Sequence, residues 1–231
     1  MGLDLYAKVE PYLDFEEQVR ELHREFLRLV FENGCNNIID IGCGQGAFMI
    51  HLGANNVDNY GIDLSAEQIS VCQEFGLNAE HKSLSEVTQT FSCATAIFDV
   101  INYLNNDEVE NFFKDTARVL EKDGYFFFDV NSLHGFEDVA QGSLNISVED
   151  KFIGIDAYFE DQKLNTAITL FTQNGDDSYS REQDVITQHY YPVKTLRNSL
   201  QNAGFQVQEV LNFHLHSDED ADKYIFVCKK L

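Results

Sequence analysis

Apolar side chains recur at three- and four-residue steps over residues 15–32, which is the spacing of one face of an amphipathic helix. The pair Asn33-Gly34 follows this run directly and is typical of a helix end. The preceding stretch, residues 3–12, is aromatic and irregular. The irregular stretch and the helix after it together make up residues 1–34. We expect this part of the chain to form an N-terminal helical lid. The apolar positions of the helix are Phe15, Val19, Leu22, Phe26 and Val30.

Short apolar runs then alternate with stretches of helical period as far as residue 131. The helix after the second run begins at a predicted capping box, with Ser65 at its N-cap and Gln68 three residues later. Strands that alternate with helices predict a parallel sheet covered by helices on both faces. The expected strands are Asn37–Ile41, Val57–Ile62, Asn78–His81, Ser92–Val100 and Tyr125–Val130.

The pattern changes at about residue 145, where β-rich segments follow one another without helices between them. The turn-like residues Glu160-Asp161-Gln162 separate two of these segments. We expect a small antiparallel β insertion over residues 145–191, placed after the fifth strand. Residues 192–231 then supply a helix and two more strands, which return the chain to the main sheet.

These elements predict an α/β fold in one domain of 231 residues. The expected architecture is a Rossmann-like three-layer sandwich. Its central sheet has seven strands that are mostly parallel, and the last strand is antiparallel.

Charge narrows the range of partners. The chain has 39 acidic and 16 basic residues, and its net charge is -23. Such a surface repels phosphate backbones and anionic lipid headgroups, so neither nucleic acid nor membrane is an expected partner. The excess carboxylates either keep the surface soluble or attract a cationic substrate, and composition leaves both readings open.

The five cysteines fit neither a zinc site nor a disulfide framework, because no two form a C-x-x-C pair and their number is odd. They indicate a reducing compartment. The chain begins without a secretory signal pattern, and no apolar run approaches the roughly 20 residues of a membrane span. We expect a cytoplasmic protein without a bound metal.

Glycines follow the first predicted strand, in the run from Ile38 to Phe48. Glycines at the end of a parallel strand let a ligand approach the main chain, and the next helix points free N–H groups at it. This spacing alone is compatible with a nicotinamide dinucleotide or with a tight turn that binds nothing. Asp40 inside the strand and Asp63 at the end of the next strand favour a ligand with cationic groups and a ribose.

In these motifs the chain resembles the class I S-adenosylmethionine-dependent methyltransferases. Asp40 to Gly46 is similar to their D-x-G-x-G-x-G motif, and Gly61 to Ser65 is similar to their second motif. Ile97 to Leu104 resembles the FDxxNYL segment of a branch that acts on small molecules, and Val119 to Tyr125 resembles the turn before the fifth strand. The resemblance implies S-adenosylmethionine as the cofactor, S-adenosylhomocysteine as the product, and residues 35–131 as the cofactor-binding core.

The resemblance also implies roles for single residues. Asp40 would help to hold the amino group of the cofactor, Asp63 would bind its ribose, and the glycines would line its methionine portion. Ser83 stands where the family often has an aspartate for the adenine amino group. The implied cofactor-binding residues are Asp40, Gly42, Cys43, Gly44, Gly46, Asp63, Leu64, Ser83, Leu84, Ile97 and Phe98.

The expected methyl acceptor is a small molecule, methylated on nitrogen or oxygen. The cofactor carries the reactivity, so the motifs fix no catalytic residue, and the candidates are Asp99, Tyr103 and His189. Two alternatives are a protein that binds the cofactor without turning it over and a methyltransferase acting on protein or tRNA. The chain is expected to be a monomer or a homodimer. The candidate pocket residues are Tyr6, Tyr12, Asn102, His134, Tyr190 and Tyr191.

Overall fold

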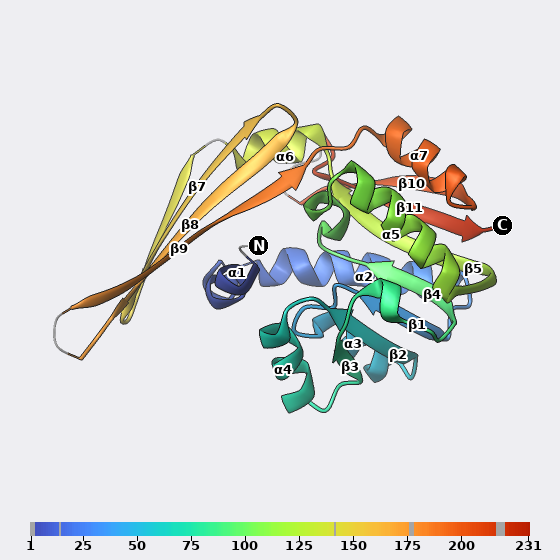
Figure 1. The fold of residues 1–231 in the computed structure, drawn as a ribbon, viewed down its shortest axis with the longest axis horizontal. Helices are drawn as coiled ribbons and strands as arrows, with labels where there is room; N and C mark the ends of the chain where they lie inside the picture. Colours follow the sequence, from blue (N-terminus) through green and yellow to red (C-terminus); the bar gives the residue numbers. More distant parts are fainter. Residues whose placement is uncertain (1–2, 14, 141, 176–177, 216–219) are drawn as a thin grey trace.

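Two β-sheets organise the chain in the computed structural model, which describes residues 3–13, 15–140, 142–175, 178–215 and 220–231. Figure 1 shows a seven-stranded sheet A with helices on both faces and a four-stranded sheet B that extends from it as an arm. Parts of the expected lid and insertion, residues 1–2, 14 and 176–177, lie outside the described residues.

Sheet A has the strand order β10-β11-β5-β4-β1-β2-β3. The pairs within β1 to β5 are parallel, whereas β11 is antiparallel to both β5 and β10. The expected seven-stranded, mostly parallel sheet with an antiparallel last strand is therefore confirmed. Its strands are β1 (Asn37–Ile41), β2 (Asp58–Asp63), β3 (Ala79–His81), β4 (Phe91–Ala96), β5 (Leu120–Asn131), β10 (Phe205–Phe213) and β11 (Lys223–Lys230).

Helices cover both faces of sheet A because its inner strands are apolar on both sides. On one face, Phe26 of α2 and Phe48 of α3 pack with Phe127 of β5. On the other face, Phe113 of α5 and Leu196 of α7 are buried in a second core. The helices are α1 (Leu3–Val9), α2 (Glu16–Glu32), α3 (Ala47–Ala54), α4 (Ala66–Glu74), α5 (Asn106–Val119), α6 (Leu133–Val139) and α7 (Val193–Asn202).

Sheet B is antiparallel throughout, in the order β6-β7-β8-β9. Asp161 and Gln162 join β7 to β8 with φ of 50° and 61°, the left-handed values that tight hairpin turns need. One face of the sheet packs against α1, which buries Leu5 and Val9 there. Its strands are β6 (Ser143–Val148), β7 (Lys151–Glu160), β8 (Lys163–Gln173) and β9 (Tyr179–His189).

Three local expectations were wrong, and one of them is the start of the fifth strand, which begins at Leu120 and not at Tyr125. The N-terminal stretch expected to be irregular contains α1, which forms because Leu5 and Val9 gain a buried surface on sheet B. The fourth strand ends at Ala96 and not at Val100, because Phe98 and Asp99 take φ of 66° and 63° and leave the extended conformation.

Candidate functional site

The glycine loop lies between β1 and α3 and is shaped by residues at positive φ. Gly42, Gly44 and Gly46 have φ of 73°, 55° and 82°. The N–H of Gly42 donates to the carbonyl of Ile62 over 2.8 Å, which fastens the loop to the end of β2. The φ of Gly46 favours glycine, and a Cβ added there would lie 2.3 Å from Leu77 Cδ1, so the Leu77 side chain would have to move. The loop therefore presents bare main chain at this edge of the sheet.

Asp63, the last residue of β2, joins the two motifs. Its Oδ2 accepts from the N–H of Gly44 over 2.9 Å, and its Oδ1 accepts from the N–H of Ser65 over 2.8 Å. A carboxylate offers about four acceptor positions, so each oxygen keeps a free lone pair. Asp63 can therefore receive two further hydroxyl donors while it holds the loop in shape.

Asp40 lies buried below the loop. Thr95 of β4, itself fully buried, donates its Oγ1–H to Asp40 Oδ1 over 2.7 Å. Burial raises the pKa of Asp40 to about 7, and the hydrogen bond from Thr95 opposes this rise. The carboxyl group therefore titrates close to neutral pH, where a cationic partner would favour its ionised form. Cys43 follows in the loop, with its side chain buried.

Three residues that the resemblance assigns to the cofactor site, Leu64, Ser83 and Leu84, differ in their exposure. Leu64 is 62% exposed, whereas Leu84 is buried in the main core. Ser83 is the N-cap of the short 3-10 helix Leu84–Glu86, and its hydroxyl donates to Glu86 Oε2 over 2.6 Å. Of these three residues, Leu64 is therefore the one whose apolar side chain is exposed to solvent and can contact a ligand.

The chain turns sharply after β4 at Ile97, Phe98 and Asp99. Asp129 of β5 accepts from the N–H of Phe98 over 2.8 Å and from the N–H of Asp99 over 3.3 Å. The buried Lys223 of β11 binds the carboxylates of Asp99 and Asp129, the latter over 3.0 Å. The left-handed turn costs conformational energy and persists because these side chains fix it. Ile97 is buried beside it.

Asn102 lies in the 3-10 helix η3 (Val100–Tyr103) and is fully buried. Its Nδ2 donates to the carbonyl of His189 over 2.8 Å, and its Oδ1 accepts from the N–H of Asn131 over 3.0 Å. The side chain thus joins the ends of β5 and β9 and does not face an open space.

Tyr103, the last residue of η3, packs with Tyr6 and Tyr12 at the interface between α1 and sheet B. Burial raises the pKa of the Tyr6 and Tyr103 hydroxyls well above the ordinary range. Both phenols therefore stay protonated at neutral pH. The structure brings these predicted residues together, although Tyr6 and Tyr12 come from the expected lid and Tyr103 from the cofactor-binding core.

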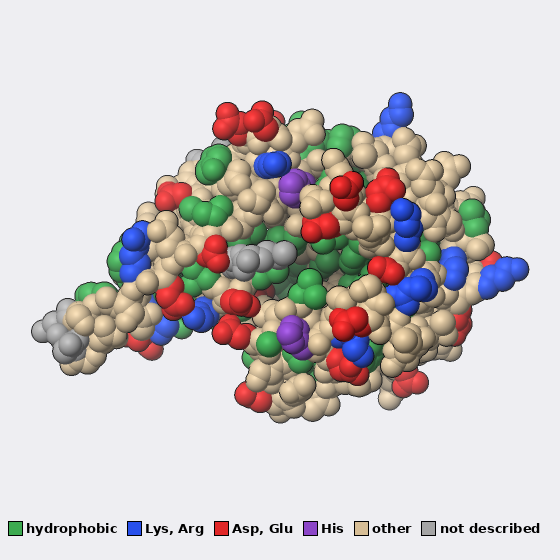
Figure 2. Space-filling model, in the orientation of Figure 1, with side chains coloured by type: hydrophobic (Ala, Val, Ile, Leu, Met, Phe, Trp, Pro, Cys, Tyr) green, Lys and Arg blue, Asp and Glu red, His purple; other side chains and the backbone are tan. Residues whose placement is uncertain are grey.

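Helix α1 lies beside the glycine loop and connects it to sheet B. Ser65, the N-cap of α4, donates to Asp4 Oδ1 over 3.1 Å, and Lys8 pairs with Glu182 of β9 at 2.6 Å. Figure 2 shows a hollow with a hydrophobic floor in the middle of this face, next to α1. The hollow therefore opens beside α1 on this face of the molecule.

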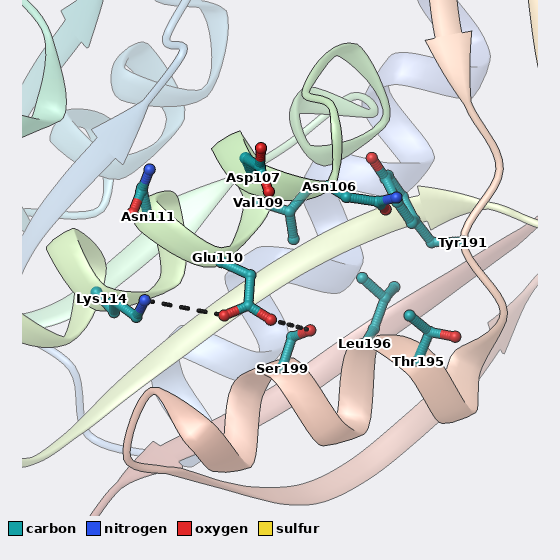
Figure 3. Close-up of a pocket in the computed structure, with 10 residues that line it drawn as sticks. All are labelled: Asn106, Asp107, Val109, Glu110, Asn111, Lys114, Tyr191, Thr195, Leu196 and Ser199. Atoms are coloured by element: carbon teal, nitrogen blue, oxygen red, sulfur yellow. Dashed lines mark hydrogen bonds and ion pairs between the residues drawn. The ribbon is translucent and has the colours of Figure 1, made fainter.

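The remaining candidates lie elsewhere. His134 is in α6, and Tyr190 packs against that helix. Tyr191 lines a groove of about 620 Å³ between α5 and α7 (Figure 3), and its hydroxyl donates to the carbonyl of Leu104. The ring centroids of His189 and Tyr191 lie 6.4 Å apart. Burial lowers the pKa of His189. The structure thus does not bring Tyr191 or His189 to the glycine loop.

Sequence patterns did not indicate Thr95, Asp129 or Lys223. A signal was present, because Thr95 and Asp129 are polar residues inside apolar strands, as Asp40 is. Over the part of the chain that the structure describes, no three His, Cys, Asp or Glu side chains gather as a metal site requires. No helix in that part is long and apolar enough to cross a membrane.

Comparison with known proteins gives the family. A family model described as a methyltransferase domain matches residues 15–210, which include the glycine loop, Asp63 and the turn after β4. The chain belongs to this methyltransferase family. A protein of Geobacillus sp. (strain WCH70), provisionally named a methyltransferase, is 24% identical to it over 234 residues, which cover 95% of this chain and 93% of that protein.

Solved structures share the fold of this methyltransferase. The crystal structure of an S-adenosylmethionine-dependent methyltransferase from Clostridium acetobutylicum ATCC 824 matches with a TM-score of 0.81 and 19% identity, covering 98% of this chain and 99% of that one. The sugar N-methyltransferase KedS8 from Streptoalloteichus sp ATCC 53650 matches with a TM-score of 0.74 and 15% identity, covering 97% and 92%. At these identities the likeness concerns the fold.

Proposed function

We propose that this methyltransferase transfers the methyl group of S-adenosylmethionine to a nitrogen or oxygen atom of a small molecule. The observation that carries the proposal is the junction of the glycine loop with Asp63, whose carboxylate binds the N–H of Gly44 over 2.9 Å. This junction lies at the carboxyl ends of β1 and β2, the edge at which open α/β sheets bind their ligands.

The residues present fit this cofactor. A Cβ at Gly42 would lie 2.9 Å from Val100 Cγ2, so the loop packs closely against η3 at this position. Asp63 has acceptor positions left for ribose hydroxyls, and the 62% exposed Leu64 offers an apolar surface to adenine. Asp40 below the loop has a pKa of about 7, so a nearby amino group would favour its ionised form and pair with it.

When bound, the cofactor supplies a methyl group that is activated by its attachment to a sulfonium. Transfer is an in-line displacement, so the chain contributes alignment and exclusion of water. The fixed turn at Phe98 and Asp99 provides a rigid wall at the end of β4. Tyr6 and Tyr103 pack at the interface between α1 and sheet B, and their phenol groups would donate hydrogen bonds to the acceptor. A neutral amine acceptor needs no base before transfer and loses its proton to water afterwards.

Two observations support a small acceptor. Helix α1 lies beside the end of β2, where its Asp4 accepts from Ser65, and it covers one face of sheet B with Leu5 and Val9. The KedS8 structure, which shares this fold over 97% of the chain, is named a sugar N-methyltransferase. The net charge of -23 weighs against tRNA as the acceptor.

Calorimetric titration with S-adenosylhomocysteine tests the cofactor. The wild-type protein should bind one molecule per chain. Asp63→Asn should weaken binding about tenfold or more, because a charge-assisted hydrogen bond is worth about 1.5–3 kcal/mol. The matched control is Asp58→Asn at the exposed start of the same strand, and it should bind as the wild type does. A wild-type protein without measurable binding would end the proposal.

The acceptor class is tested by the release of S-adenosylhomocysteine from S-adenosylmethionine. Small amines, amino sugars and phenols form one panel, and unfractionated tRNA and denatured protein form another. We expect turnover with a member of the first panel. Turnover confined to tRNA or protein would contradict the small acceptor, and cofactor binding without any turnover would favour a non-catalytic binding protein.

A further inference from the structure

Two cysteine side chains meet beside the glycine loop. Cys43 lies in the loop itself, and Cys72 lies in α4, the helix that follows β2. The thiol of Cys72 donates to the carbonyl of Gly44 over 3.2 Å, and the sulfur of Cys43 lies 3.8 Å from the same oxygen. Both cysteines belong to one small buried cluster. The two sulfurs therefore converge on one carbonyl of the loop, although they come from different elements.

This carbonyl belongs to the residue that joins the loop to Asp63. The N–H of Gly44 donates to Asp63 Oδ2 over 2.9 Å, so both main-chain polar groups of Gly44 are held by side chains. The sulfur of Cys72 also packs against the loop at Gly46, 3.1 Å from the position of an added Cβ. A displacement of the sulfurs is therefore passed directly to the main chain of the loop.

The thiols of Cys43 and Cys72 also interact with each other. This interaction raises the pKa of Cys43 and lowers that of Cys72. The thiolate is the form of cysteine that reacts with an oxidant, so Cys72 is the group to be oxidised first, with Cys43 beside it as the second thiol. All five cysteines of the chain are free thiols. In a reducing compartment, disulfides between such neighbours are transient and serve as sensors.

We propose that Cys43 and Cys72 form a redox switch, in which hydrogen peroxide joins them in a disulfide that weakens cofactor binding. The Cys72 thiolate attacks the O–O bond and becomes a sulfenic acid, and the hydroxide that leaves takes up the thiol proton. The sulfur of Cys43 then displaces a second water and forms the S–S bond. Two thiols and one peroxide thus give one disulfide and two waters. The inference rests on the proposed function, because it concerns the regulation of that site.

The disulfide would disturb the loop in two ways. It brings the sulfurs to about 2.05 Å from each other and leaves neither with a proton, so the carbonyl of Gly44 loses its bond from Cys72. It also draws Cys43 toward α4. Because Cys43 directly precedes Gly44 in the chain, the N–H of Gly44 then moves relative to Asp63. Bound cofactor should in turn favour the reduced pair, since a coupling between two equilibria acts in both directions.

The experiment titrates S-adenosylhomocysteine into wild type and Cys72→Ser, each reduced and each after treatment with hydrogen peroxide. Peroxide should weaken binding to the wild type about fivefold or more, and dithiothreitol should restore it. Cys72→Ser should bind as the reduced wild type does, before and after peroxide. An oxidised wild type with unchanged affinity, or a Cys72→Ser protein that stays equally sensitive, would overturn the switch. Absence of binding to the reduced wild type would instead overturn the proposed function.

The matched control is Cys35→Ser. Cys35 interacts with Cys93, and it precedes β1, at the opposite end of that strand from the glycine loop. This variant removes one thiol of a second cysteine pair and leaves the pair at the loop intact. It should therefore lose affinity after peroxide treatment as the wild type does. A Cys35→Ser protein that resists peroxide would assign the effect to the other pair and contradict the switch.

A second measurement uses the unaltered protein, in case Cys72→Ser does not fold. Peroxide-treated wild type is cleaved by a protease without reduction, and mass spectrometry identifies the joined peptides. The peptides that contain Cys43 and Cys72 should be joined, and S-adenosylhomocysteine added before the peroxide should lower the joined fraction. Absence of this link, or a link confined to Cys35 and Cys93, would overturn the switch whether or not the cofactor binds.

Discussion

Asp40 makes the stability of the protein depend on pH. Burial raises its pKa from 3.8 to about 7, so between these values the folded protein holds a proton that the unfolded chain has lost. The stabilisation by this proton is present below pH 4 and is lost as the pH rises through 7. Asp40→Asn should therefore flatten the fall in unfolding free energy by up to about 1.4 kcal/mol per pH unit. Urea unfolding of both proteins at several pH values measures this, and parallel curves would contradict it.

Lys223 shows the cost of a charge that loses its counter-ion. It lies buried between Asp99 and Asp129, which are buried as well or nearly so. Lys223→Met would leave their carboxylates without a cation, and breaking such a buried pair costs about 3–5 kcal/mol. The unfolding free energy in urea should fall by this amount. The double variant with Asp129→Asn should recover part of the loss.

The control for this prediction lies on the same strand. Lys229 pairs with Asp123 over 3.3 Å at the surface, where water screens the charges. Lys229→Met should change the unfolding free energy by less than about 1 kcal/mol. Equal effects of the two lysine variants would show that the buried position of Lys223 is not what matters.

Single residues of the site were predictable when their signal was local. Asp40, Gly42 and Asp63 follow one another within or just after short strands, so sequence spacing alone placed them at one edge of the sheet. Lys223 lies 94 positions from Asp129 and meets it only because β11 pairs with β5.

At the scale of elements, α1 depends on what it packs against. The helix has seven residues, too few to be stable alone, and its buried residues Leu5 and Val9 contact sheet B. Val9→Asp would place a charge in this interface and should release α1 from sheet B. Amide hydrogen exchange of α1 should then become fast, while sheet A keeps its protection.

Turnover and cofactor affinity of Val9→Asp, measured separately, distinguish the acceptor part of the site from its cofactor part. If α1 serves the acceptor, Val9→Asp should lower turnover while the affinity for S-adenosylhomocysteine changes little. Lys8→Gln is the control, because it removes only the Lys8–Glu182 pair, whose side chains are 43% and 49% exposed. An unchanged turnover in Val9→Asp would exclude α1 from the acceptor site.

Contacts with distant parts of the chain also explain why the observed end of β4 differs from the end expected from sequence. Residues 97–100 have the apolar composition of a strand, yet Asp129 binds the N–H groups of Phe98 and Asp99 and holds them in the left-handed region. No window of sequence around β4 contains that carboxylate. Helices with strong apolar periods, such as α2, were placed within a residue or two because their own pattern determines them.

At the scale of the whole molecule, the net charge of -23 acts on every ligand that approaches. S-adenosylmethionine carries a net positive charge from its sulfonium, whereas S-adenosylhomocysteine is neutral overall. An acidic protein concentrates cations around it, and salt removes this attraction because the screening length falls from about 30 Å at 0.01 M to about 3 Å at 1 M. Affinity for the methyl donor should therefore depend on salt more than affinity for the product.

Calorimetric titration of both ligands across that range of salt measures the difference. The dissociation constant of S-adenosylmethionine should rise several-fold, and that of S-adenosylhomocysteine should stay within about twofold. Because the two ligands share adenosine, amino group and carboxylate, a change common to both reports on the protein, and the difference between them isolates the sulfonium. A difference that does not grow as salt is removed would mean that the acidic surface serves solubility alone, and the attraction of cationic ligands would have to be abandoned.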